Sequence, residues 1–147
     1  MKRKRGQSVV EFAIVFPFFL LIVVGGIIDF GFTFYNMIAL QQLSDDVALY
    51  AAEGKGSSLG LPSIGDITTY VTNKKPTWWA GEITTTVLPD GVVSDGSANK
   101  VKKIKLSYES PLYTPFWQTA TQVVGGNKSI TLSVMSAYQV PAVVITR

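Results

Sequence analysis

The arrangement of apolar and polar positions separates the N-terminal third of the chain from the rest. Residues 12–28, FAIVFPFFLLIVVGGII, form a run without any charged side chain. Apolar residues then recur at the spacing of one helical face, while other positions become polar. We therefore predict one helix from about Ser8 to about Glu53, apolar on all sides at first and striped in its second half. The predicted stripe, which would pack on a head, comprises Leu40, Leu43, Val47 and Tyr50, with Gln41, Gln42, Ser44, Asp45 and Asp46 on other faces.

The uncharged run is long enough to cross a membrane. Its 17 residues span about 25 Å as a helix, near the lower limit for a bilayer core. Basic residues occupy positions 2–5, and no other base occurs until Lys55. The positive-inside rule then places the N-terminus in the cytoplasm and the rest of the chain outside. Pro17 lies inside the run, and we expect it to kink or locally loosen the helix.

Beyond Glu53 the pattern predicts a small head over residues 54–147. Alternation of apolar and polar residues is typical of half-buried strands. A three-stranded antiparallel sheet could pack one face on the helical stripe, which predicts an α+β fold. The predicted strands cover residues 82–88, 100–108 and 129–138.

Other segments of the head have weaker signals. Pro89–Gly91 has the composition of a turn. Residues 116–124 fit a short helix, and residues 63–73 fit either a helix or a strand. We favour a short helix there, with Ser63 as its cap and with Ile64, Ile67 and Val71 on one face.

Composition removes several function classes. The 147-residue chain contains no histidine and no cysteine, which excludes thiol chemistry, Ser-His-Asp catalysis and a zinc site of His or Cys ligands. The head holds five acids but no clustered pair, so we predict no enzyme, no cofactor, no metal and no small-molecule substrate. The net charge of +3 comes from the four bases at positions 2–5, because ten acids outnumber the other nine bases. We therefore predict no nucleic-acid binding.

The sequence KRKRGQSVVE carries the sharpest local signal. A basic stretch ends in Gly6, an apolar helix follows at once, and Glu11 is the fifth residue when Gln7 is counted as the first. This arrangement resembles the class III signal of type IV pilins and pseudopilins, which a prepilin peptidase cuts after the glycine. Such a cut would free the amine of Gln7 and leave Glu11 as an acid that needs a partner in an apolar filament.

The next residues narrow the resemblance to one family. The region from Arg5 to Ala52 resembles TadE-like proteins, which are minor pilins or pseudopilins of the tight-adherence (Flp) pilus system. The similar elements are RG at 5–6, VEFA at 10–13, Pro17, IIDFG at 27–31, FY at 34–35 and YAA at 50–52. The chain departs from the family at Phe32 and at Asp45 and Asp46, where basic residues are frequent in the family, so it lacks those bases for any partner contact.

The resemblance implies a layout and a function. It implies a pilin-like fold with a leader at 1–6, a helix at 7–53 that spans the membrane at 12–28, and a head at 54–147. It implies a subunit for assembly or priming of an adhesive pilus, single-pass in the cytoplasmic membrane and then in an extracellular or periplasmic pilus. The 94 residues after Glu53 favour a minor subunit, because the major pilin of that system is shorter.

The implied partners and site residues follow from the same comparison. The partners are prepilin peptidase, other pilin or pseudopilin subunits, the inner-membrane assembly platform, and membrane lipid before assembly. Cleavage would occur between Gly6 and Gln7, and docking or register would depend on Glu11, Pro17 and Asp29. Asp29 either pairs within a filament or marks the outer membrane interface.

Alternatives remain open from the residues alone. The N-terminal segment also fits a cleavable secretory signal or a plain signal anchor. The head would then be a secreted or anchored binding or adhesin module. The lysines at 100, 102, 103 and 105 fit a solvated strand edge or face better than an anionic-ligand site. Trp78 and Trp79 fit partial burial or a subunit contact better than a ligand site.

Overall fold

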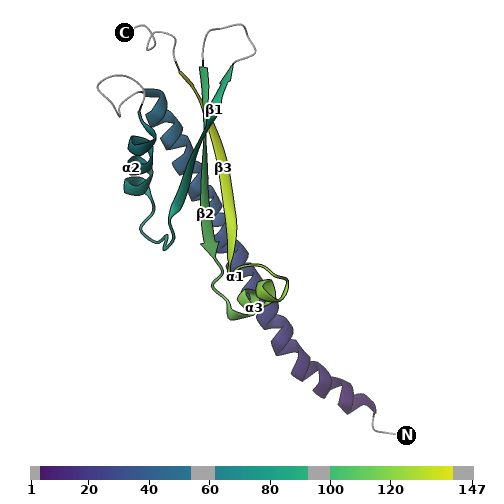
Figure 1. The fold of residues 1–147 in the computed structure, drawn as a ribbon. Helices are drawn as coiled ribbons and strands as arrows, with labels where there is room; N and C mark the ends of the chain where they lie inside the picture. The colour runs from purple at the N-terminus through teal and green to yellow at the C-terminus, as the bar shows by residue number, and fades with distance from the viewer. Residues whose placement is uncertain (1–3, 54–61, 93–99, 141–147) are drawn as a thin grey trace, which may run out of the picture. The chain divides into compact units, whose positions relative to one another are not determined.

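The computed structural model describes residues 4–53, 62–92 and 100–140 (Figure 1). Helices and strands follow one another as an α+β chain, with a long first helix and a small sheet. The elements are α1 (Lys4–Glu53), α2 (Ile64–Lys74), β1 (Ile83–Val92), β2 (Lys100–Pro111), α3 (Pro115–Val123) and β3 (Ser129–Val140).

Helix α1 begins earlier than predicted and ends where predicted. It starts at Lys4 rather than near Ser8, because Lys and Arg are good helix formers and extend the helix outward from its apolar run. Pro17 lies inside α1, and residues on both sides of it are helical. The missing N–H of a proline removes one backbone hydrogen bond without ending a helix of this length.

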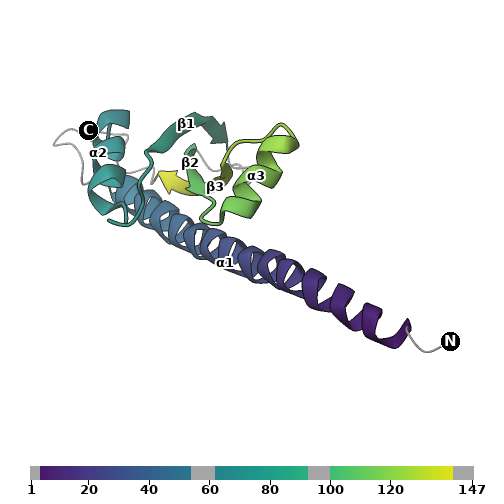
Figure 2. The ribbon, with the colours of Figure 1, turned by 90° about the horizontal axis from the view of Figure 1, so that it is seen from below.

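The described chain forms two compact units. The first, called the N-terminal unit here, combines Met1–Phe34 with Pro111–Ile130, and the second, called the sheet unit, combines Tyr35–Ser110 with Thr131–Arg147. The predicted boundary after Glu53 does not coincide with this division. Helix α3, expected in the head, belongs to the same unit as the first part of α1, and it lies beside that helix in each view (Figure 2).

The sheet has the order β1-β2-β3, so β2 is its central strand. Strands β1 and β2 are antiparallel, with Val87 opposite Ile104 and Thr85 opposite Leu106. Ile104 and Leu106 are buried whereas Lys103 is exposed, as the alternation predicted.

The predicted turn at Pro89–Gly91 is wrong. These residues continue β1, and the register with β2 shifts between Leu88 and Gly91. Proline has no N–H for the ladder, and such a residue is accommodated at an irregularity of an edge strand.

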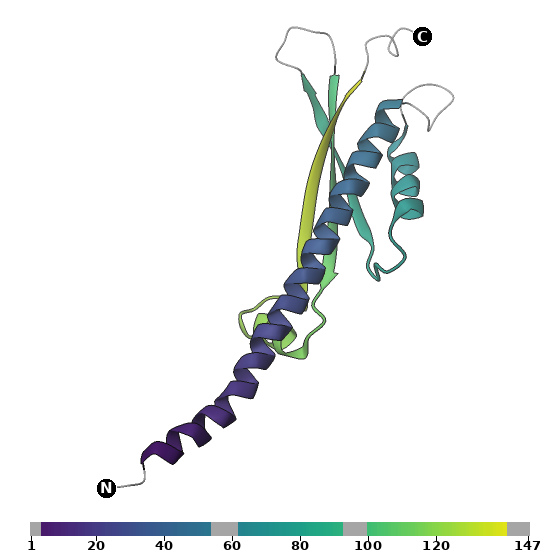
Figure 3. The ribbon, with the colours of Figure 1, turned by 180° about the vertical axis from the view of Figure 1, so that it is seen from behind.

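In the sheet unit, residues 35–53 of α1 run along one face of the sheet (Figures 1 and 3). Leu40, Leu43 and Val47 are buried, and Tyr50 is half-buried and stacks on Tyr70 with ring centroids 4.1 Å apart. Ser44 was expected on another face, but it is fully buried. The buried face therefore includes a small polar residue that an apolar pattern does not detect.

Residues 63–73, whose pattern fitted either a helix or a strand, form the cap and most of helix α2. The Ser63 side chain accepts a hydrogen bond from the Asp66 N–H at 3.2 Å, and the Ser63 N–H donates to the Asp66 carboxylate at 2.9 Å. This reciprocal capping box fixes a helix start. Ile67 and Val71 are buried as predicted, whereas Ile64 is exposed, because it occupies the first turn of the helix.

Candidate functional site

The first part of α1 exposes apolar side chains on every side. Each residue from 7 to 24 is exposed, and an 18-residue window of the helix has a mean hydropathy of 2.5. A helix that is apolar all round and uncovered by its own chain fits a lipid environment rather than water. The described residues contain one helix of this kind, and it is consistent with membrane anchoring.

Glu11 lies at the exposed start of this helix. Its carboxylate accepts a hydrogen bond of 3.1 Å from the Gln7 side chain, one turn earlier. Gln7 is the residue predicted to carry a new amine after cleavage. Gly6 belongs to the helical residues, since α1 begins at Lys4. Gly6, Gln7 and Glu11 therefore lie within two consecutive turns of α1.

Asp29 is a buried acid with partners in its own chain. Its side chain is 2% exposed. Its carboxylate accepts hydrogen bonds from the N–H of Tyr113 at 2.7 Å and of Thr114 at 3.1 Å, and also from the Thr114 hydroxyl. Thr114 is the N-cap residue of α3, so the carboxylate occupies the position favoured by the positive end of that helix. Asp29 thus fastens the start of α3 to α1, and we call this set of bonds the Asp29 clasp.

A glycine pair provides the room for this contact. A side chain on Gly25 would meet Thr114 at 3.5 Å, and one on Gly26 would meet the Trp117 indole nitrogen at 3.3 Å. The absence of a Cβ lets the α3 segment approach the helix backbone closely. The clasp and the glycine pair were not predicted as one site. Gly-Gly just before an isolated Asp was the available signal, but its partner is 85 residues further along the chain.

Aromatic side chains surround the same contact in the N-terminal unit. Phe30 meets Trp117 edge to face at 6.0 Å between ring centroids, and Phe32 lies 4.8 Å from Tyr113. Phe32 is therefore part of an aromatic contact.

An apolar groove adjoins the clasp. It has a volume of about 880 Å³ and is lined mainly by the face of α1 from Phe16 to Ile28 and by Thr114, Pro115 and Phe116. Pro17 contributes to the lining, so one predicted docking residue borders the segment that Asp29 holds.

A second polar cluster lies inside the sheet unit. The Asn36 amide donates to the Ser110 hydroxyl at 2.9 Å and accepts from the Trp79 indole N–H at 2.9 Å. Trp79 is buried and stacks on Tyr108 at 4.2 Å. These bonds satisfy every member of the cluster and tie α1 to β2 and to the loop before β1.

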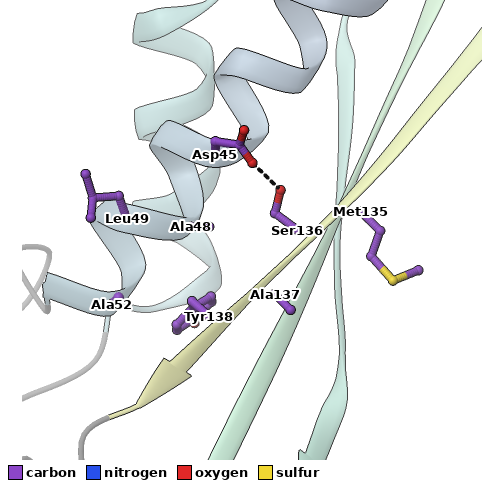
Figure 4. A pocket seen from close by; sticks show the side chains of 8 residues that line it. All are labelled: Asp45, Ala48, Leu49, Ala52, Met135, Ser136, Ala137 and Tyr138. Atoms are coloured by element: carbon purple, nitrogen blue, oxygen red, sulfur yellow. Dashed lines mark hydrogen bonds between the residues drawn. The ribbon is translucent and has the colours of Figure 1, made fainter.

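Asp45 contacts β3 rather than projecting only into solvent. The Ser136 hydroxyl donates to its carboxylate at 3.2 Å, and Ser136 also shares a hydrogen bond of 2.6 Å with the hydroxyl of Ser44. An open hollow of about 480 Å³ borders these residues. Figure 4 shows Ser136 turned toward Asp45 and Met135 turned away from α1.

The other predicted features lie apart from these contacts. Lys103 and Lys105 are exposed on the face of the central strand rather than at an edge. Trp78 is half exposed, with its ring 5.8 Å from Tyr35. Over residues 4–53, 62–92 and 100–140, no group of three or more acids, histidines or cysteines is placed to hold a metal ion.

The layout of the chain and its N-terminal segment can each be compared with known proteins. A long apolar helix followed by a three-stranded antiparallel sheet gives the chain a pilin-like α+β layout. The family model described as TadE-like protein matches residues 6–49. The resemblance predicted from the N-terminal motifs is thus confirmed over this segment. No curated protein and no solved structure matches the chain.

Proposed function

We propose that the chain is a minor pilin or pseudopilin subunit that takes part in assembly or priming of a Tad/Flp-type adhesive pilus. The observation that carries the proposal is the TadE-like match over residues 6–49. That segment contains the whole exposed apolar part of α1 and includes Gly6, Gln7 and Glu11. The proposal includes no enzymatic activity, cofactor or nucleic-acid binding.

The proposed maturation and assembly of the subunit have two stages. It first sits in the cytoplasmic membrane with its N-terminus inside and its sheet unit outside, as the basic residues before α1 favour. Prepilin peptidase then cuts after Gly6, and the subunit enters the pilus through the assembly platform. In the pilus, the Gln7 amine of a neighbouring subunit would pair with Glu11, because an unpaired acid among apolar helices costs several kcal/mol.

The deciding experiment is the intact mass and N-terminal sequence of the protein recovered from cells. We expect a mature chain that begins at Gln7. A matched variant, Gly6→Ala, should remain at its full length in the membrane. A chain that begins near Gly26 would instead indicate a secreted binding module, and an uncut wild-type chain would indicate a signal-anchored one.

A further inference from the structure

Helix α3 has an apolar stripe that its own unit covers only in part. Apolar residues occupy positions 116, 117, 120, 123 and 124, the spacing of one helical face. Trp117 is half-buried on α1 over Gly26. Val123 and Val124 at the other end are 82% and 88% exposed. The stripe therefore continues beyond the surface that α1 provides.

Charged side chains are few around α3. None occurs in residues 111–127, and residues 12–34 contain Asp29 alone. The nearest base in the chain, Lys128, is exposed, and its carbonyl accepts a hydrogen bond of 3.0 Å from the Leu112 N–H. The three donors of the clasp enclose that carboxylate. Helix α3 itself and the adjoining part of α1 thus present no exposed charge, which is unusual for a surface in contact with water.

The attachment point of α3 is continuous with the apolar span. Gly25 and Gly26 fall in the last turn of the uncharged run, and Asp29 comes directly after it. The aromatic pairs of Phe30 with Trp117 and of Phe32 with Tyr113 lie at the same level of α1. Aromatic side chains with a polar edge concentrate where a membrane meets water.

We propose that α3 is a second membrane contact, lying in the outer interfacial layer of the bilayer with Val123 and Val124 turned toward the lipid. The inference rests on the membrane anchoring of α1 proposed above, and it adds a lipid-facing role for a segment near the C-terminus of the chain. The Asp29 clasp holds α3 at this depth. The polar side of α3 consists of Gln and Thr residues, so the contact depends on apolar burial rather than on anionic lipid headgroups.

The absence of cysteine allows a direct test on the full-length chain. Single cysteines, introduced as Val124→Cys and, on the polar side of the same helix, Gln122→Cys, carry a nitroxide spin label. Phe19→Cys reports the apolar span and Ser133→Cys reports an exposed strand position of the sheet unit. Each protein is placed in phosphatidylcholine vesicles, with or without phosphatidylglycerol. Collisions with oxygen, which enters lipid, are compared with collisions with a water-soluble nickel chelate.

We expect the ratio of oxygen to nickel collisions to be several-fold higher for the label at position 124 than for the label at position 122. We also expect this difference to persist when phosphatidylglycerol is omitted. The label at position 19 should report a lipid environment and the label at position 133 an aqueous one.

Three results would overturn the proposal in distinguishable ways. A water-exposed label at 124 beside a lipid-exposed label at 19 would reject the interfacial helix and keep the anchoring. Labels in water at both positions would reject the anchoring as well. A label at 124 that is shielded from both reagents, and freed by diluting the protein in lipid, would show that a second copy of the chain covers α3.

Discussion

At the residue scale, Asp29 shows how one acid is accommodated in an uncharged part of the chain. Its carboxylate accepts bonds from two backbone N–H groups and one hydroxyl of residues 113 and 114. Hydrogen bonds to a charged group contribute more than bonds between neutral groups. In the sheet unit, the buried polar side chain of Asn36 is likewise accommodated by hydrogen bonds, to Trp79 and Ser110.

Replacing Asp29 by Ala should release the start of α3. The N–H groups of Tyr113 and Thr114 lose their acceptor, so we expect their hydrogen exchange to accelerate about tenfold or more, given about 1.5–3 kcal/mol for a bond to a charged group. Mass spectrometry of the peptide over residues 111–124 measures this change. Asp46→Ala, at an exposed position in the sheet unit, is the control and should leave that peptide unchanged. Unaltered exchange in Asp29→Ala would contradict the clasp.

At the element scale, each short helix is positioned by a small number of local features. Helix α3 lies against α1 where Gly25 and Gly26 leave room for it. Helix α2 starts at the capping box of Ser63 and Asp66, which overrides the strand propensity of its Thr and Val residues. Its buried face then consists of Ile67 and Val71.

Gly26→Leu should push α3 away from α1. A Cβ at this position already approaches the Trp117 ring at 3.3 Å, so the larger side chain displaces the indole, at a cost of about 1–3 kcal/mol. Gly31→Leu is the matched control, because a Cβ on Gly31 meets nothing within 4 Å. Both changes raise helix propensity equally. We expect faster hydrogen exchange in α3 for the first variant only, and equal exchange in both would disprove the close contact.

The capping box predicts a pH effect on α2. Hydrogen bonds from the Ser63 side chain and backbone lower the pKa of Asp66 below its ordinary value of 3.8. A lowered folded-state pKa stabilises the helix above the ordinary pKa, and the contribution is lost as the pH falls through the lowered value. NMR titration of the Asp66 carboxyl should show its pKa rising toward 3.8 in Ser63→Ala. Thr69→Ala, inside the same helix, is the control and should leave it lowered.

At the scale of the whole molecule, the chain combines an exposed apolar helix with a folded sheet unit that carries its own core. The N-terminal unit combines two segments that lie far apart in the sequence, since Pro111–Ile130 joins Met1–Phe34. None of the residues that the structure describes covers the exposed apolar surface of α1. Under the proposed function, lipid covers this surface before assembly, and neighbouring subunits cover it afterwards.

Glu11 should matter for assembly but not for processing. We expect Glu11→Ala and Glu11→Gln to be cut after Gly6 and then to enter pili poorly, because neither can form an ion pair with an amine of another subunit. A glutamine at position 11 can still accept the hydrogen bond that Gln7 donates at 3.1 Å. Glu11→Gln therefore tests the role of the charge without removing this intrachain bond. The measurement is the ratio of pilus-associated to membrane-associated protein. Normal incorporation of Glu11→Gln would remove the role of the charge.

Prediction from sequence succeeded where a pattern is local. The apolar run, the spacing of Leu40, Leu43 and Val47, and the period-two alternation of β2 each depend on neighbouring residues. Predictions failed where a distant segment decides the outcome. Ser44 is buried because it shares a hydrogen bond with Ser136, 92 positions away. Pro89 has the chemistry of a turn residue but lies in β1, where a register shift accommodates it.

The sequence by itself determined that the chain has a long apolar helix, a small α+β remainder and a TadE-like N-terminal segment, because hydropathy, period and motif spacing are properties of contiguous residues. The tertiary structure alone decided that α3 lies on α1 and that Asp29 holds it there. Both depend on which segments meet in space. Asp29 and Tyr113 are separated by 84 positions along the chain, and no local pattern of residues signals that they meet.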